Sequence, residues 1–176
     1  AVGLNATTDS ELTKYFVNLP RSAFEFWCYM ESERLLRPVM RQFYQERDVV
    51  REERRMRYED DPGRKLYEAV LSVAYRVHPY RNPVIGYAFD IERLTARQTE
   101  EFRKRYYVPG NIAIGLVGEV NSERDLPLLE KYFARIPAGP LPPRPFAPEP
   151  PQEGARELQV QMPVSPRLML AYHKPN

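Results

Sequence analysis

Cysteine and histidine are scarce in this sequence of 176 residues, which holds one cysteine, Cys28, and two histidines, His78 and His173. A single cysteine excludes an internal disulfide framework and a zinc site built from cysteines. Aromatic residues surround Cys28 in the sequence, and free cysteine is among the most buried residue types. We therefore predict a core thiol at this position rather than a nucleophile.

Long apolar runs and an excess of one charge are also absent. No apolar stretch approaches the roughly 20 residues of a membrane-spanning helix. Lysine and arginine number 26 against 24 aspartates and glutamates, and the two signs are interleaved, whereas a nucleic-acid surface needs a basic excess on one face. We expect neither a membrane span nor a nucleic-acid partner. The sequence starts with neither a methionine nor a signal peptide, so we expect a piece of a longer protein.

The most informative stretch that is present runs over residues 43–57 and predicts one long helix, extending over about 39–58. One stripe of this helix carries four apolar residues and two acids: Phe43, Val49, Val50 and Met56 with Glu46 and Glu53. Carboxylates about 10 Å apart on a core-facing stripe need a cation opposite them, because an unpaired buried charge is costly. In the alternative interpretation, the neighbouring arginines pair with both acids on a solvated face. The pattern by itself favours that second interpretation.

The other elements follow from local signals. Residues 4–9 and 12–19 predict two strands joined by a turn at Asp9-Ser10. Further helices are predicted from Ser22 with a capping box to Glu25, over 64–76, after Thr95 with a capping box to Gln98, and from a cap at Ser122 to about residue 136. Residues 112–120 form the strongest buried-strand signal, and residues 156–162 with 167–173 predict a hairpin.

Eight of the fifteen residues 137–151 are proline, which is typical of an extended, semi-rigid linker. We therefore expect residues 1–136 to form most of one domain, 137–155 to form the linker, and 156–176 to begin a second, incomplete domain. Helices are grouped rather than alternating strictly with strands. This order predicts an α+β fold with a largely antiparallel sheet covered by helices on one face.

Three segments together resemble one family. They are L-N-A-T-T-D-S-E-L-T-K-Y at 4–15, E-R-D-V-V-R-E-E at 46–53, and Y-Y-V-P-G-N-I-A-I-G-L-V-G-E-V at 106–120. In this order, and with the proline linker behind them, they resemble the pitrilysin, insulinase and mitochondrial processing peptidase family of zinc metallopeptidases, which carry an inverted H-x-x-E-H motif. The resemblance implies a metallopeptidase-like domain of the processing-peptidase type, truncated at its N-terminus.

The resemblance also implies roles for particular residues. In that family two histidines of H-x-x-E-H and a glutamate of a second helix hold zinc, and the open position binds the water that attacks the peptide bond. Glu53 corresponds to the ligand glutamate, and Glu46 corresponds to a nearby acid that supports the catalytic site. Asn5, Ala6 and Thr7 match an edge strand that binds an extended peptide substrate through main-chain groups.

The sequence departs from the family pattern, because it contains no H-x-x-E-H, and we expect neither His78 nor His173 to bind metal. We therefore expect zinc in the intact metalloendopeptidase, zinc absent or weakly bound in these 176 residues, and no activity from them alone. The expected partners are a peptide substrate and the remainder of the protein or a homologous subunit. Dimer formation and the compartment, bacterial periplasm or cytoplasm, stay open.

Two other interpretations remain. The parent could be a non-catalytic partner subunit of a heteromeric peptidase, which binds peptide or the active subunit. Alternatively, the chain could be a stand-alone α+β interaction module that captures a partner through residues 4–9 at an exposed edge.

Overall fold

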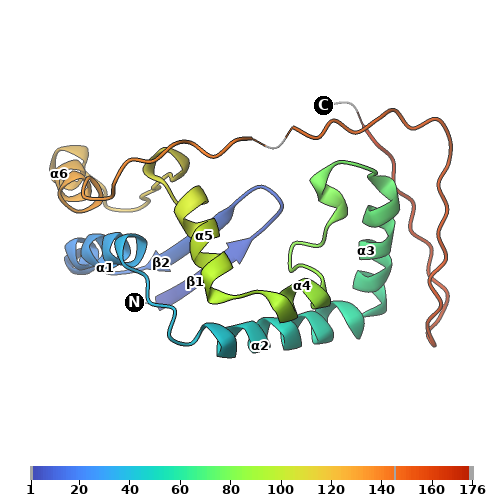
Figure 1. Cartoon of the computed structure of the whole chain (residues 1–176). Coiled ribbons are helices and arrows are strands. Elements are labelled where there is room, and N and C mark those ends of the chain that lie inside the picture. The colour runs from blue at the N-terminus through green and yellow to red at the C-terminus, as the bar shows by residue number, and fades with distance from the viewer. Residues whose placement is uncertain (1, 145, 175–176) are drawn as a thin grey trace. The chain divides into compact units, whose positions relative to one another are not determined.

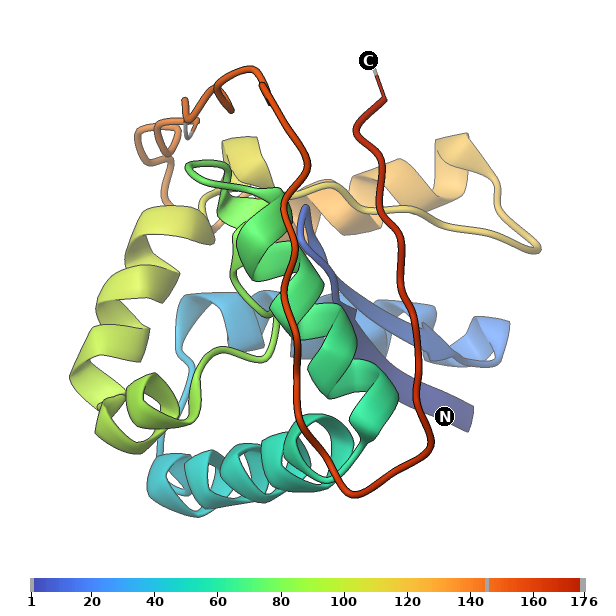
Figure 2. The same ribbon diagram turned by 90° about the vertical axis from the view of Figure 1, so that its right-hand side faces the viewer.

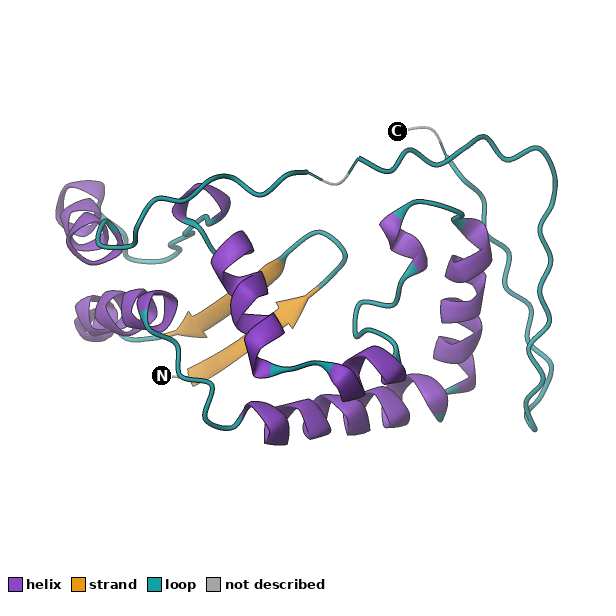
Figure 3. Cartoon of the chain, viewed as in Figure 1, coloured by secondary structure: helices purple, strands orange, loops and turns teal. Residues whose placement is uncertain are grey.

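The computed structural model describes residues 2–144 and 146–174. The chain divides into two compact units, one formed by residues 1–41 with 95–144 and the other by residues 42–94 with 145–176. Helices dominate both units, and the described residues contain one two-stranded antiparallel sheet (Figures 1 and 3). The predicted α+β class is confirmed.

In the first unit, β1 (Val2–Thr8) pairs antiparallel with β2 (Thr13–Asn18). The side chain of Asp9 shapes the connecting turn, since its Oδ1 accepts hydrogen bonds from the backbone N–H groups of Glu11 and Leu12 at 2.8 and 3.0 Å. Gly3 has φ +72° inside the irregular stretch of β1 between Val2 and Asn5, a conformation that glycine adopts without a steric penalty. Both predicted strands are confirmed within one or two residues.

The helices of this unit are η1 (Arg21–Ala23), α1 (Phe24–Leu36), α5 (Ala96–Tyr106), η4 (Pro109–Asn111) and α6 (Ser122–Phe133). The capping box of Thr95 and Gln98 is confirmed at the start of α5. Two predicted caps are wrong. Ser22 lies inside η1, and Asn121 rather than Ser122 caps α6, because its side-chain oxygen accepts the N–H of Arg124 at 3.1 Å.

The small core of the first unit lies where α1 packs against α6. Phe24 is 6% exposed and Cys28 is fully buried, which confirms the predicted core thiol. Trp27 lies between Phe24 and Phe133, with ring centroids 5.8 and 6.0 Å away. At the edge of this contact, Lys131 donates to Glu25, which the sequence suggested as part of a capping box. Aromatic burial therefore holds α1 and α6 together.

The second unit contains α2 (Phe43–Arg54), the π-helical turn η2 (Arg55–Glu59), α3 (Pro62–Ala74), η3 (Pro79–Arg81) and α4 (Ala88–Arg93). The helix predicted over 39–58 is therefore confirmed from Phe43 onward. The short helix α4 was not predicted; it packs against α2 and contributes the buried Ile91. Figure 2 shows residues 146–174 descending past α3 and turning back as two extended limbs.

Three strand predictions are wrong. Residues 112–117 and both predicted limbs, 156–162 and 167–173, have no regular secondary structure and are drawn as loops in Figure 3. A tight turn does join the limbs, where Val164 N donates to Met162 O at 2.8 Å. However, Leu168, Leu170 and Tyr172 are 84, 68 and 85% exposed, so no packed apolar face holds the limbs in a ladder, and an isolated hairpin is only marginally stable.

Candidate functional site

The outer edge of β1 has no strand partner among the described residues, along the positions that the resemblance assigns to peptide binding. Paired residues are Asn5 with Phe16, Ala6 with Tyr15 and Thr7 with Lys14. Hydrogen-bonded and non-bonded pairs alternate in an antiparallel ladder, and Asp9 N bonds Leu12 O at 3.0 Å. Counting from that bond, Asn5 and Thr7 form bonded pairs with β2, while the N–H and C=O groups of Ala6 face outward.

The side chain of Asn5 forms a hydrogen bond with one of these outward-facing groups, the N–H of Ala6. Its Oδ1 accepts a hydrogen bond from Ala6 N at 2.8 Å, which agrees with an Ala6 N–H that turns away from β2. Asn5, Ala6 and Thr7 are all exposed. An extended peptide adding to this edge would therefore find the carbonyl of Ala6 open, and would have to displace the Asn5 amide oxygen to reach the Ala6 N–H.

The two acids of α2 lie on an exposed face of the helix. Glu46 is exposed, and the Glu53 side chain is 37% exposed with an ion pair of 2.6 Å to Arg57. Three of the four apolar members of the predicted core stripe are also exposed, with Val49 and Met56 at 56% and Val50 at 36%, and Phe43 is half-buried. The expectation that this stripe faces a core within the chain is wrong for the described residues. Glu53 has the arginine partner that the solvated-face interpretation predicted.

Arginine, rather than valine, faces inward from α2. Arg54 is the buried residue of the helix, and its guanidinium donates to the carbonyl oxygen of Gly86 at 2.7 Å and to Glu68 at 2.9 Å. Earlier in the same helix, Arg47 donates to the carbonyl oxygen of Leu94 at 3.4 Å, and Arg51 pairs with Glu92 at 2.6 Å. These three arginines recur at i, i+4 and i+7 and so share one face. The sequence suggested these arginines as partners of Glu46 and Glu53, but at this spacing they bind more distant groups, because a long arginine side chain reaches beyond its own helix.

The two histidines take part in ring packing. His78 Nδ1 accepts the backbone N–H of Tyr80 at 3.3 Å, and His173 stacks on Tyr75 with ring centroids 5.1 Å apart. Among the described residues, no group of three or more histidine, cysteine, aspartate or glutamate side chains could hold a metal ion. The donor set of residues 2–144 and 146–174 therefore does not make a complete zinc site, and Glu53 would need ligands from elsewhere.

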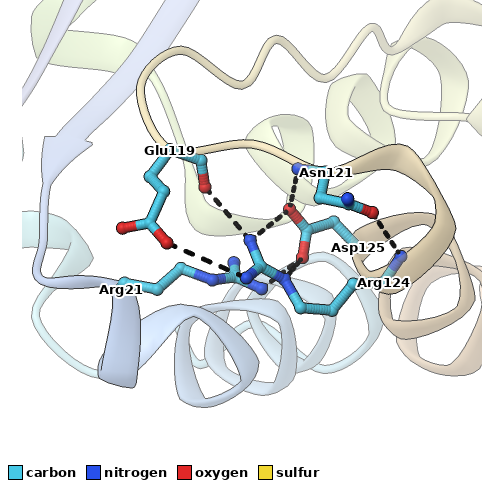
Figure 4. A network of polar contacts seen from close by, with 5 residues as sticks. All are labelled: Arg21, Glu119, Asn121, Arg124 and Asp125. Atoms are coloured by element: carbon cyan, nitrogen blue, oxygen red, sulfur yellow. Dashed lines mark hydrogen bonds and ion pairs between the residues drawn. The ribbon is translucent and has the colours of Figure 1, made fainter.

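A polar cluster ties η1, which follows β2, to the start of α6 (Figure 4). Asp125 is 2% exposed and forms an ion pair with Arg21, while its second oxygen accepts the N–H of Asn121 at 2.9 Å. Arg124 Nε donates to the same carboxylate at 2.9 Å. The hydrogen bond from Arg124 outweighs the opposing effect of burial and, with Asn121 and Arg21, lowers the pKa of Asp125 to about 2. The cluster is therefore ionised and fixed at neutral pH.

A second anchored carboxylate lies in the proline-rich segment. Glu149 accepts backbone hydrogen bonds from residues 76, 77 and 78 at 2.6, 2.8 and 3.0 Å. Arg156 donates to the carbonyl oxygens of Val73 and Ala74 at the C-terminus of α3. Arg156 satisfies C=O groups that the C-terminus of α3 leaves unpaired, and Glu149 binds N–H groups of the loop that follows, so residues 149 and 156 are both held beside this helix end.

Comparisons with known proteins confirm the resemblance to this peptidase family. Residues 93–176 match the family described as the peptidase M16 inactive domain. The chain is 36% identical over 163 residues to zinc protease PqqE of Helicobacter pylori, and 32% identical over 171 residues to an uncharacterised zinc protease of Mycobacterium tuberculosis. These alignments cover 89 and 95% of the chain.

Solved structures agree with the sequence comparisons. A protease from Helicobacter pylori superposes with a TM-score of 0.78 at 32% identity over 84% of this chain. The first half of the periplasmic protease PqqL from Escherichia coli superposes with a TM-score of 0.72 at 23% identity over 82% of this chain, and so supports the fold. The chain spans only about a third of these relatives, with 36% of PqqE, 37% of the solved protease and 32% of the PqqL half covered.

None of the helices in the described parts of the chain is long and apolar enough to cross a membrane. The predicted division at residues 136 and 155 is not tested by the comparisons and stays a prediction. The same holds for the roles of Glu46, Glu53, Asn5, Ala6 and Thr7.

Proposed function

We propose that this chain, a relative of the M16 zinc proteases, forms part of a zinc-dependent metalloendopeptidase and supplies its peptide-binding edge strand and one metal ligand. The observation that carries the proposal is the outer edge of β1, where the main-chain groups of Ala6 face away from β2 at a position matching the family's substrate strand. Binding through such groups suits a protease that accepts many peptide sequences, because every peptide offers the same backbone.

The acids of α2 would act in the same protein. Glu53 would provide a carboxylate ligand to zinc. Glu46 lies seven residues, or almost two helical turns, before Glu53, so both carboxylates would lie on the same exposed face of α2. When bound, zinc supplies an activated water at neutral pH. This chain's own part is to present the two carboxylates on a helix whose rotation is held by Arg47 and Arg54, and to align the peptide.

For Glu53 to bind metal, its carboxylate must leave Arg57, 2.6 Å away. Both side chains are more than one third exposed, and exposed pairs contribute only about 0–1 kcal/mol, so the exchange costs little. The two further ligands and the catalytic base would come from outside residues 1–176. The chain alone is therefore expected to bind peptide without cleaving it.

A proline scan of the edge strand tests this function. Ala6→Pro removes an outward N–H and should abolish binding of an extended peptide while leaving the hairpin intact, because proline is tolerated at a sheet edge. Thr7→Pro removes an N–H that bonds β2 and should unfold the hairpin. Binding is measured by calorimetry and the hairpin by amide exchange of residues 13–18. Equal peptide affinity in wild-type and Ala6→Pro chains would contradict the proposal.

The description of residues 93–176 as an inactive M16 domain favours a second candidate, a non-catalytic subunit that binds peptide or an active partner. The two candidate functions predict different zinc contents for the complete protein. The complete protein should contain about one zinc ion per chain if it is an enzyme, and Glu53→Gln should lose it. A complete protein that binds peptide with no zinc would support the partner subunit.

A further inference from the structure

Residues 149–174 form the two extended limbs beside α3, and the first limb is fixed to the C-terminal end of this helix (Figure 2). Arg156 donates to two carbonyl oxygens in the last turn of α3, at 2.8 and 2.7 Å, and Glu149 accepts three N–H groups from residues 76–78. The two side chains are only 17 and 14% exposed and lie 3.8 Å apart. Charged groups that bond several main-chain groups in this way are strong anchors.

The second limb contacts both ends of the same helix. His173 stacks on Tyr75, the residue that follows α3, with ring centroids 5.1 Å apart and an angle of 19° between the planes. Near the start of α3, a Cβ added to Gly63 would meet Nη1 of Arg167 at 2.9 Å, so the guanidinium lies directly against the backbone there. Contacts at both ends of a helix fix the direction of the limb, whereas a single contact would let it swing.

The same helix also holds α2, which carries the two acids. Arg54 of α2 pairs with Glu68 of α3 at 2.9 Å, and their side chains are 9 and 20% exposed. In the turn η2 between the two helices, the ring centroid of Tyr58 lies 5.8 and 5.6 Å from the guanidinium carbons of Arg54 and Arg64. These distances allow cation–π attraction on top of the ion pair. α3 is therefore bonded to α2 and to both limbs.

All of these elements belong to one compact unit, formed by residues 42–94 and 145–176. The proline-rich residues before Glu149 are a semi-rigid spacer, which by itself would leave the chain behind it a range of directions. The contacts on α3 restrict that range. The chain covers only 36% of PqqE and 37% of the solved protease, so the direction in which the limbs are held bears on how the rest of a complete protein is placed.

We propose that Glu149, Arg156 and His173 clamp the limbs on α3 as positioning residues, so that the part of the complete protein behind the limbs keeps one orientation relative to the acids of α2. The clamp acts on α2 through α3 and the pair of Arg54 with Glu68. What it aligns rests on the proposed function, in which those acids lie at the catalytic site. Because small displacements of aligning groups cost large factors in rate, the clamp would affect use of the peptide rather than binding of zinc.

Spin labels measure the clamp in this chain. Val49 of α2 and Leu170 of the second limb are 56 and 68% exposed, so Val49→Cys and Leu170→Cys can carry nitroxides while the buried Cys28 stays unlabelled. Pulsed electron paramagnetic resonance should give a narrow distribution of distances between the labels. Glu149→Gln and Arg156→Gln should each widen this distribution by at least about twofold, because the limbs then keep only part of their contacts.

The matched control is Glu153→Gln, at an exposed position of the first limb, which should leave the distribution narrow. Arg156→Lys keeps the charge and can still donate to the end of α3, so it should restore part of the narrow distribution. Circular dichroism checks that each variant keeps its helices. A wide distribution in the parent chain, or equal widths in the parent, Glu149→Gln and Arg156→Gln chains, would overturn the proposal.

Kinetics of the complete protein test what the clamp aligns. Glu149→Gln and Arg156→Gln should raise KM for a peptide substrate by at least about threefold and leave the zinc content unchanged, whereas Glu153→Gln should change neither. An unchanged KM in both clamp variants would overturn the link to the acids of α2. A complete protein without zinc would overturn the proposed function, but the spin-label distances would still decide whether the clamp exists, so the two proposals fail separately.

Discussion

The guanidinium of Arg54 donates a hydrogen bond of 2.7 Å to the carbonyl oxygen of Gly86, so the rotation of α2 about its own axis is set by a buried arginine. Arg54 also pairs with Glu68 at 2.9 Å and lies 3.4 Å from Glu59. Because Arg54 faces inward, Glu46 and Glu53 are carried on a different face of the same helix. The position of the acids therefore depends on a residue that carries none of the proposed chemistry.

Removing Arg54 should destabilise the second unit. Arg54→Ala leaves Glu68 and the carbonyl oxygen of Gly86 without their partner, and removing one member of a buried pair costs about 3–5 kcal/mol. The neighbouring Arg55 is 54% exposed and pairs with Glu52 and Asp60, so Arg55→Ala should cost less than about 1 kcal/mol. Urea unfolding of both variants measures the difference. Equal losses would show that Arg54 does not anchor α2.

The proposed metal ligand predicts a contrast between neighbouring glutamates. In the complete protein, Glu53→Gln should lower zinc affinity by at least about 100-fold, since it removes a ligand rather than an outer partner. Glu52→Gln, on the same helix and paired with Arg55, should keep zinc. Glu46→Gln should keep zinc and lose peptidase activity. Metal content measured by mass spectrometry, together with a peptide-cleavage assay, distinguishes the three variants. A Glu53→Gln protein that retains its full zinc content would rule out Glu53 as a zinc ligand.

Glu149 predicts an acid-sensitive anchor for the proline-rich segment. Burial opposes ionisation, but three backbone N–H groups at residues 76–78 and the nearby Arg156 outweigh it and lower the pKa of Glu149 to about 2. A depressed carboxyl pKa contributes stability that is complete above the unfolded value, near 4.5, and is lost as the pH falls toward 2. Protection of the amides of residues 76–78 should fall over that interval.

Substitution isolates the contribution of this carboxylate. Glu149→Gln should expose the amides of residues 76–78 to exchange at neutral pH and remove the pH dependence between about 4.5 and 2. Glu153→Gln, at an exposed position of the same segment, is the matched control. Retention of the acid transition in Glu149→Gln would assign it to another group.

Cys28 should be unreactive in the folded chain. Burial raises the pKa of its thiol to about 11, and the thiolate is the reactive form. Labelling by a thiol reagent at pH 8 should be slow in the native protein and fast in 6 M guanidinium. Rapid native labelling would mean that the contact between α1 and α6 opens readily.

Several features could be read from the sequence because they depend on neighbours a few residues away. The capping box of Thr95 and Gln98 closes within one helical turn, and the hairpin of β1 and β2 is closed by the side chain of Asp9. The family resemblance likewise rests on short segments in a set order, and the comparisons confirm it. Such features need little from the rest of the chain.

The tertiary structure decided two matters that the sequence left open. The first is which face of α2 is buried: a long arginine can reach a distant carbonyl, so Arg54 lies inside while Val49 is exposed. The second is whether residues 112–120 form a strand. Their sequence determines a strong tendency to do so, but a strand exists only when another backbone satisfies its N–H and C=O groups, and the described residues provide none.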